Sequence, residues 1–132
     1  MDLDTIIERV RGLTWQDREV DALIYHCFPS YVDDRGHTFL SLDIDAQIVV
    51  YVKTENGTVS PPVPAFTASI DACVSLIERE LPGFLWRIGT DGPDDAPFGW
   101  VGRDDEAGHL AATPTLALLL AFLTAMKEKS HD

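Results

Sequence analysis

Two cysteines and several histidines are the side chains of this sequence that could hold a metal ion or attack a substrate. Cys27 follows His26 directly, while His37, Cys73 and His109 are spread along the chain. No pair has the spacing of a zinc motif such as Cys-x-x-Cys, and adjacent residues on a helix point about 100° apart. A Cys–His–Asp nucleophile would need residues far apart in sequence to meet. The pattern favours core cysteines and surface histidines, so we predict no catalytic residue and no metal site.

Two acidic turns could bind calcium or a basic protein. The stretches "GTDGPDDA" (89–96) and "DDEAG" (104–108) carry Asp91, Asp94, Asp95, Asp104, Asp105 and Glu106. Neither stretch has the calcium-binding EF-hand spacing D-x-[DN]-x-[DN]-G. If the strand between them pairs as a meander, the turns lie at its opposite ends and cannot share an ion. We predict solvated turns, with Asp94, Asp95, Asp104 and Asp105 as candidate contacts for a basic partner.

Aromatic and basic residues gather in "FLWRI" (84–88) and "PFGWVGR" (97–103). Arginine and aromatic side chains on paired strands can stack against a nucleotide-like ligand. Arg87, Trp100 and Arg103 are therefore candidate ligand-binding residues. The alternative is that the aromatic residues face helices and belong to the core.

Trp15 is a candidate anchor for a protein partner, because tryptophan is enriched at binding surfaces. It stands at the start of a predicted helix. Packing against the neighbouring helix is the alternative, and it is the more common role of such a residue.

Two helices are predicted in the N-terminal part of the chain. Apolar residues recur at helical spacing from Leu3 to Leu13. The stretch "TWQD" (14–17) has the form of a capping box with Thr14 as N-cap, which predicts a second helix running to about Cys27.

The middle of the chain predicts strands followed by a helix. The stretch 39–45 alternates apolar and polar residues, 47–53 is β-branched, and 58–60 follows an Asn-Gly turn. An amphipathic helix is expected over 69–81 after a Thr67 or Ser69 cap. Further strands are expected at 84–88, 97–103 and 109–112.

The last predicted helix is apolar almost all the way round. Thr113 is its expected N-cap with Pro114 next, and from Leu116 to Met126 only Thr124 is polar. One stripe can cover a sheet, but the opposite side still needs a cover, from the N-terminal helices or from a second subunit. We expect self-association through Leu118, Phe122 and Ala125, and hence a homo-oligomer.

This order of elements predicts one α+β domain over residues 1–132, in which an antiparallel sheet and helices form a layered sandwich. The formal charge of −12 opposes DNA and RNA binding through a basic face. We find no signal peptide and no run of the roughly 20 apolar residues that a membrane helix needs. We therefore expect a cytoplasmic protein that does not bind membranes.

Two stretches carry a family resemblance: "PAFTASIDACVSLIEREL" (64–81) and "AATPTLALLLAFLTAM" (111–126). With the Trp-bearing hairpin between them and "REVDALIYHCF" (18–28), they resemble the phage ABA-sandwich domain, a family of small proteins encoded by phages and prophages. The resemblance implies a layered α/β fold and a phage or prophage origin, and it implies no catalytic residues. The β-rich stretch departs from the family pattern, so we expect an added β-hairpin around residues 38–60.

We accordingly predict a small acidic phage or prophage accessory protein that acts in the host cell by binding. Its expected role is a protein-interaction module, or an inhibitor of a host factor, that meets a basic host protein. The alternative is a binder or sponge for a nucleotide-like small molecule at the arginine and tryptophan residues named above. A third reading is a metal-dependent hydrolase, which would need a bound ion or a perturbed titratable group in a cleft. We expect no enzyme and no cofactor.

Overall fold

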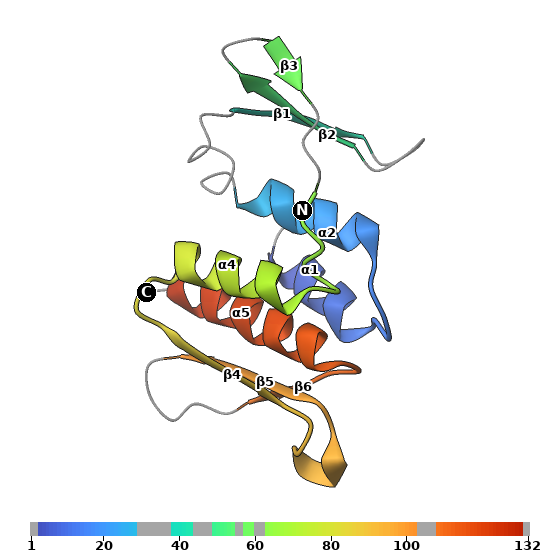
Figure 1. Ribbon diagram of the computed structural model, residues 1–132, viewed down its shortest axis with the longest axis vertical. Coiled ribbons are helices and arrows are strands. Elements are labelled where there is room, and N and C mark those ends of the chain that lie inside the picture. Colours follow the sequence, from blue (N-terminus) through green and yellow to red (C-terminus); the bar gives the residue numbers. More distant parts are fainter. Residues whose placement is uncertain are drawn as a thin grey trace.

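Helices and antiparallel strands share this chain, as its sequence predicts. The computed structural model describes residues 3–28, 38–43, 49–54, 57–59, 63–102 and 108–130. The elements are α1 (Leu3–Arg11), α2 (Arg18–Cys27), β1 (Thr38–Asp43), β2 (Val49–Thr54), β3 (Gly57–Val59), α4 (Ile70–Glu80), β4 (Leu85–Gly89), a 3-10 turn (Pro93–Asp95), β5 (Phe98–Gly102), β6 (His109–Leu110) and α5 (Pro114–Ser130). The α+β class is confirmed (Figure 1).

The strands form two separate three-stranded antiparallel sheets. One has the order β1-β2-β3, and the other has the order β4-β5-β6. The first sheet contains the β-hairpin expected around residues 38–60, with β3 as a third strand. It lies beyond α2, at the opposite end of the molecule from the second sheet (Figure 1). The second sheet is the one that packs on α5.

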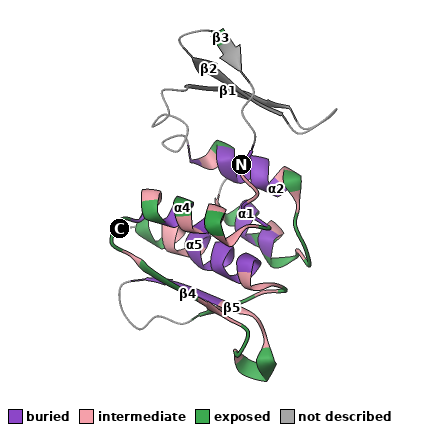
Figure 2. Cartoon of the chain, viewed as in Figure 1, coloured by how far each residue is buried: buried purple, intermediate pink, exposed green. Residues whose placement is uncertain are grey.

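Helix α5 lies at the centre of the fold. The sheet β4-β5-β6 packs on one side of it, and α1 and α4 pack on another (Figure 1). Every residue from Leu116 to Leu123 is buried, and Figure 2 shows buried residues concentrated around this helix. Because the sheet and the other helices surround α5, this helix needs no polar face toward solvent. Its sequence accordingly contains none.

The burial of α5 within its own chain corrects our expectation that this helix mediates self-association. Leu118 is 0% exposed and Phe122 is 1% exposed, so neither side chain is available to a second subunit. The ring of Phe122 lies 5.4 Å from the ring of Phe28, at the end of α2. Ala125 is half-buried and packs against the same core. The chain itself therefore supplies the cover that we had assigned to self-association through these residues.

The contact between α5 and the second sheet depends on Gly99. A Cβ atom at this position would lie under 3.0 Å from the backbone atoms of Ala117 and Leu118. Such a close approach is open only to glycine. Gly99 therefore points toward α5, and alternation along β5 turns Phe98 and Trp100 to the opposite face of the sheet.

Side-chain caps mark the starts of α2, α4 and α5. The cap of α2 is a different residue from the one that we predicted. Asp17, rather than Thr14, is the N-cap of α2, because its carboxylate accepts from the backbone N–H groups of Glu19 and Val20. Ser69 caps α4, and the Thr113 hydroxyl accepts from the backbone N–H of Leu116 in α5. No helix in the described part of the chain is long and apolar enough to cross a membrane.

Candidate functional site

The face of the second sheet that points away from α5 gathers apolar and aromatic side chains. Strand pairing sets Arg87 opposite Trp100 and Phe98 opposite Leu110. With Leu85, which alternation places on the same side, these five residues form what we call the outer sheet face. Leu85 is 61% exposed and Leu110 is 49% exposed, which is unusual for large apolar side chains on one small sheet.

Arg87 and Trp100, two of the predicted ligand-binding residues, contact each other. The guanidinium carbon of Arg87 lies 5.5 Å from the centroid of the Trp100 ring, in cation–π geometry. Trp100 is buried, so its exposed surface is small and is bordered by its own chain's arginine. The third predicted residue, Arg103, lies outside the described residues.

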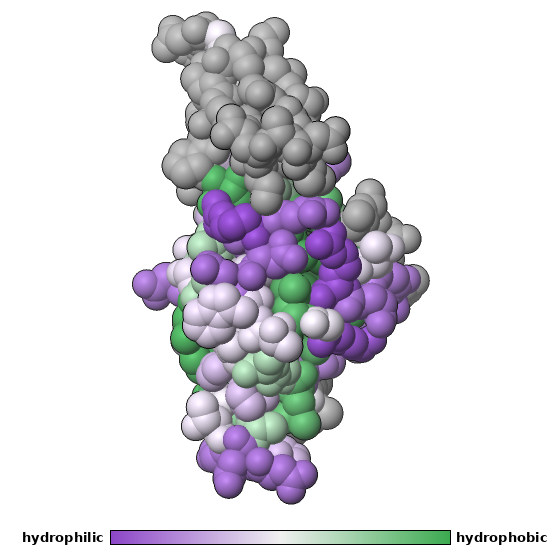
Figure 3. Space-filling view, turned by 90° about the vertical axis from the view of Figure 1, so that its right-hand side faces the viewer, coloured by the Kyte–Doolittle hydropathy of each residue, from purple (hydrophilic) through white to green (hydrophobic). Residues whose placement is uncertain are grey.

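An acidic turn borders the outer sheet face. Asp94 and Asp95 both have φ of +58° and stand exposed in the 3-10 turn between β4 and β5. A Cβ atom on Gly92 would lie 3.3 Å from Leu110 and 3.5 Å from Phe98, so this turn sits directly beside the apolar side chains. In Figure 3, hydrophilic residues at the lower tip of the molecule lie next to hydrophobic ones. The predicted Asp104 and Asp105 lie outside the described residues.

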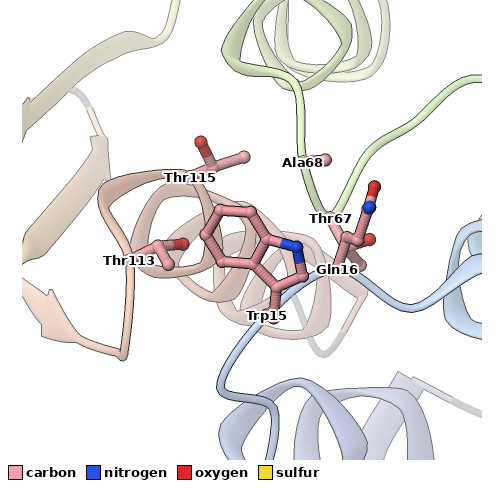
Figure 4. A pocket seen from close by; sticks show the side chains of 6 residues that line it. All are labelled: Trp15, Gln16, Thr67, Ala68, Thr113 and Thr115. Carbon is pink, nitrogen blue, oxygen red and sulfur yellow. The ribbon is translucent and has the colours of Figure 1, made fainter.

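Trp15 lies on a different part of the molecule. Its side chain is 67% exposed, and it stands beside a pocket that Gln16, Thr67, Ala68, Thr113 and Thr115 also line (Figure 4). The structure thus separates Trp15 from Asp94 and Asp95, which we had grouped as partner-binding residues.

A buried polar network lies behind this pocket. The Asp21 carboxylate is 0% exposed and accepts from the backbone N–H of Thr67 at 2.7 Å and from its hydroxyl at 2.8 Å. Its second oxygen accepts from Arg18 at 2.8 Å. Burial raises the pKa of Asp21 above its usual value, while Thr67 and Arg18 oppose that rise. These bonds join α2 to the segment that precedes α4.

Sequence reasoning did not find this network. Asp21 and Thr67 are 46 positions apart, and an aspartate in a first helical turn is ordinarily a surface residue. It also missed Leu85, Leu110 and Thr115. The alternation of residues along 84–88 was the one available signal, because it separates Leu85 and Arg87 from Phe84 and Trp86.

Cys73 is a core residue. It is 1% exposed, and its thiol donates to the Phe66 carbonyl at 3.0 Å. Burial, with a smaller contribution from the Asp21 charge, raises the pKa of Cys73 to about 12, so the thiol is protonated at neutral pH. Cys27 is half-buried and free of any disulfide. Within the described ranges, no three His, Cys, Asp or Glu side chains lie close enough together to hold a metal ion.

Comparisons with known proteins add no assignment, since no family model, curated protein or solved structure matches this chain.

Proposed function

We propose that this chain is a protein-interaction module that binds a partner through the outer sheet face. The observation that carries the proposal is the exposure of Leu85 and Leu110 beside Trp100 on one small sheet. Apolar side chains that gather on one surface mark interaction sites, and tryptophan and arginine are enriched among the residues that contribute most to binding.

The charges favour a basic partner over a second copy of the chain. Asp94 and Asp95 stand exposed at the edge of the outer sheet face, and Arg87 is its one basic residue. The whole chain carries a formal charge of −12, so two copies repel each other at long range. A partner with apolar side chains flanked by lysine or arginine complements both parts of this surface.

The resemblance to the phage ABA-sandwich domain adds an origin to this proposal. On that basis the partner is a basic host protein, and the chain is an accessory protein of a phage or prophage that binds or inhibits it.

The first test uses two short peptides as probes, one of leucine and lysine and the other of leucine and glutamate. NMR spectra of the labelled protein locate the binding site on the chain. The lysine peptide should shift the resonances of Leu85, Trp100 and Leu110, and the glutamate peptide should not. Replacing Leu85 and Leu110 by serine should weaken binding by about tenfold. Trp15→Ala, which removes an exposed aromatic side chain elsewhere, should leave the affinity unchanged.

The charge argument has its own pair of variants. Asp94→Asn with Asp95→Asn removes two charges beside the outer sheet face, and asparagine tolerates the positive φ at both positions. Asp71→Asn with Glu78→Gln removes two charges from exposed positions on α4. Only the first pair should weaken binding of the lysine peptide. Equal effects of the two pairs would mean that net charge alone attracts the peptide, and the proposal would then be wrong.

A further inference from the structure

Strand β4 forms one edge of the second sheet, and its backbone is unpaired on the side away from β5. The sheet has the order β4-β5-β6, so β4 bonds to a neighbouring strand on one side only. Within the part of the chain that the structure describes, no hydrogen bond from another segment reaches the other side of Leu85–Gly89. Such an edge presents a row of N–H and C=O groups with which another strand can pair.

The edge at β4 lacks the features that usually protect a strand edge. Proteins protect such edges with short strands, prolines, bulges or charged side chains. Strand β6, at the opposite edge, has two residues, whereas β4 has five residues, no proline and an unbroken register with β5. The one charged residue of β4 is Arg87, and its guanidinium lies over the Trp100 ring of β5 rather than beyond the free edge.

Exposed apolar side chains lie on both faces of β4. Leu85, on the outer sheet face, is 61% exposed. Trp86 is turned to the face that carries α5, because it alternates with Leu85, and it is still 38% exposed. Figure 2 shows this exposed strand beside the mostly buried β5. Helix α5 therefore does not cover the sheet as far as this edge.

An added strand matches both the open backbone and the two apolar faces. Its N–H and C=O groups would pair with β4 at a strand spacing of about 4.8 Å, and its side chains would alternate between the faces. One set would lie beside Leu85, where the opposite residue of β5, Gly102, has no side chain. The other set would lie beside Trp86. A helix laid on the outer sheet face would leave Trp86 and the backbone edge uncovered.

The charge at one end of β4 indicates which strand fits. Gly89 ends the strand, and a Cβ atom there would lie 2.8 Å from a carboxylate oxygen of Asp91. Asp94 and Asp95 stand exposed in the turn that follows. A lysine or arginine of the added strand, placed beside Gly89, would meet these carboxylates. A second copy of β4 has only Arg87 to place there, and it would bring its own acidic turn.

We propose that the partner contributes an extended segment that pairs with β4 as an added strand of the second sheet. This segment carries apolar or β-branched side chains on both faces and a basic residue beside the acidic turn. The inference rests on the proposed function, because it names the conformation of one segment of the partner that the outer sheet face binds. The rest of that partner lies across the outer sheet face toward Leu110.

The probe is a peptide of alternating valine and threonine with a lysine at each end, long enough to pair with the five residues of β4. Amide hydrogen exchange, followed by NMR, reports on the strand edge directly. In the free protein, alternate amides of β4 should exchange rapidly, because they point away from β5. A saturating concentration of the peptide should slow these amides by about tenfold or more and leave those of β6 unchanged. The same peptide with an N-methyl group on every valine and threonine lacks these donors and should not bind.

Four results would overturn strand addition. They are no binding of the peptide, binding that leaves the β4 amides unprotected, equal binding of the methylated peptide, and a dimer of the free protein in which those amides are already protected. If the leucine–lysine peptide still shifts the resonances of Leu85, Trp100 and Leu110, the proposed function stands without the added strand. Protection of β4 by the strand peptide, with no binding of the leucine–lysine peptide, would instead contradict the outer sheet face.

Two variants and a matched control complete the test. Trp86→Thr removes the ring from the face opposite to the outer sheet face, keeps a residue that favours strands, and should weaken binding of the strand peptide by about tenfold. Leu85→Ser should also weaken it. Leu110→Ser removes an exposed leucine from β6, which β5 separates from β4, and should leave the affinity unchanged. Unchanged affinity in both Trp86→Thr and Leu85→Ser would show that the peptide does not bind at β4.

Discussion

Helix α5 and the outer sheet face are both strongly apolar, but α5 is buried whereas large apolar side chains of the outer sheet face are exposed. The helix is covered on every side by its own chain, and Leu118 and Phe122 have almost no exposed surface. Leu85 and Leu110 remain about half exposed on the outer face of the same sheet that packs on this helix. Apolar composition alone does not show whether a surface is free to bind a partner. That is decided by which distant segments fold over it.

The strongest test of this comparison is Phe122→Ala. The side chain is fully buried against Phe28, so truncation should lower the free energy of unfolding by about 4 kcal/mol. Urea denaturation followed by circular dichroism would measure it. A loss below about 1 kcal/mol would mean that Phe122 is not enclosed in the chain, and the helix would again become a candidate for self-association.

Gly99→Ala tests the contact between α5 and the covered face of the sheet. The added methyl group would meet the backbone of Ala117 and Leu118, which cannot rotate away, so we expect a loss of about 3 kcal/mol. Gly12→Ala is the matched control, because a Cβ there would have only ordinary contacts, at 3.7 and 3.8 Å. Its stability in the same urea experiment should equal that of the wild type or exceed it. Equal losses in the two variants would contradict the close approach at Gly99.

Asp21→Asn tests the polar contacts that hold the helices around α5. The amide cannot replace both the Arg18 pair and the Thr67 bonds, so a loss of about 2 kcal/mol is expected at neutral pH. In the wild type, the raised pKa means that the folded state holds the Asp21 proton more tightly than the unfolded state does. This contribution to stability is fully present below pH 3.8, the ordinary value, and is lost as pH rises through the raised pKa. The difference in free energy of unfolding between wild type and variant should therefore become smaller as pH rises from 3.8 through the raised pKa. Urea unfolding at several pH values would measure this difference.

Replacing Leu85 and Leu110 by serine should have the smallest effect on folding. Both side chains are largely exposed, so we expect a combined loss below about 1 kcal/mol, despite the change from leucine to a polar residue. The same double variant should bind the lysine peptide about tenfold more weakly. A loss of unfolding free energy as large as that of Phe122→Ala, in the same urea experiment, would show that the outer sheet face is covered and that the two regions do not differ.

Local signals in the sequence predicted the elements well. Pro114 after Thr113, the Ser69 cap and the alternation along β4 depend on neighbours only, and each gave the correct element. The start of α2 was misplaced because both Thr14 and Asp17 are good N-caps. Arg9 lies beside Asp17 in space, and a single-sequence reading does not include that contact.

The binding surfaces were less predictable, since they depend on contacts between distant segments. The residues next to Leu118 in the sequence do not show that α1 and α4 cover one side of its helix. They also do not show that Gly99 allows the sheet to pack closely against another side. The pocket beside Trp15 needs three segments to meet, and Thr115 by itself resembles any threonine in a first helical turn. Trp15 was singled out by residue type alone, and its exposure came only from the structure.

The position of α5 in the chain order has a consequence for the time course of folding. The helix follows every other described element, yet α1, α4 and the sheet β4-β5-β6 all pack on it. Asp4 of α1 forms an ion pair with Lys127, close to the end of α5. A ribosome adds about 5–20 residues per second, so the earlier elements wait for several seconds without the helix that joins them. Nascent chains that stop before residue 114 should therefore expose their apolar surfaces to chaperones and remain open to proteases, and protection should arise abruptly once α5 is free of the exit tunnel.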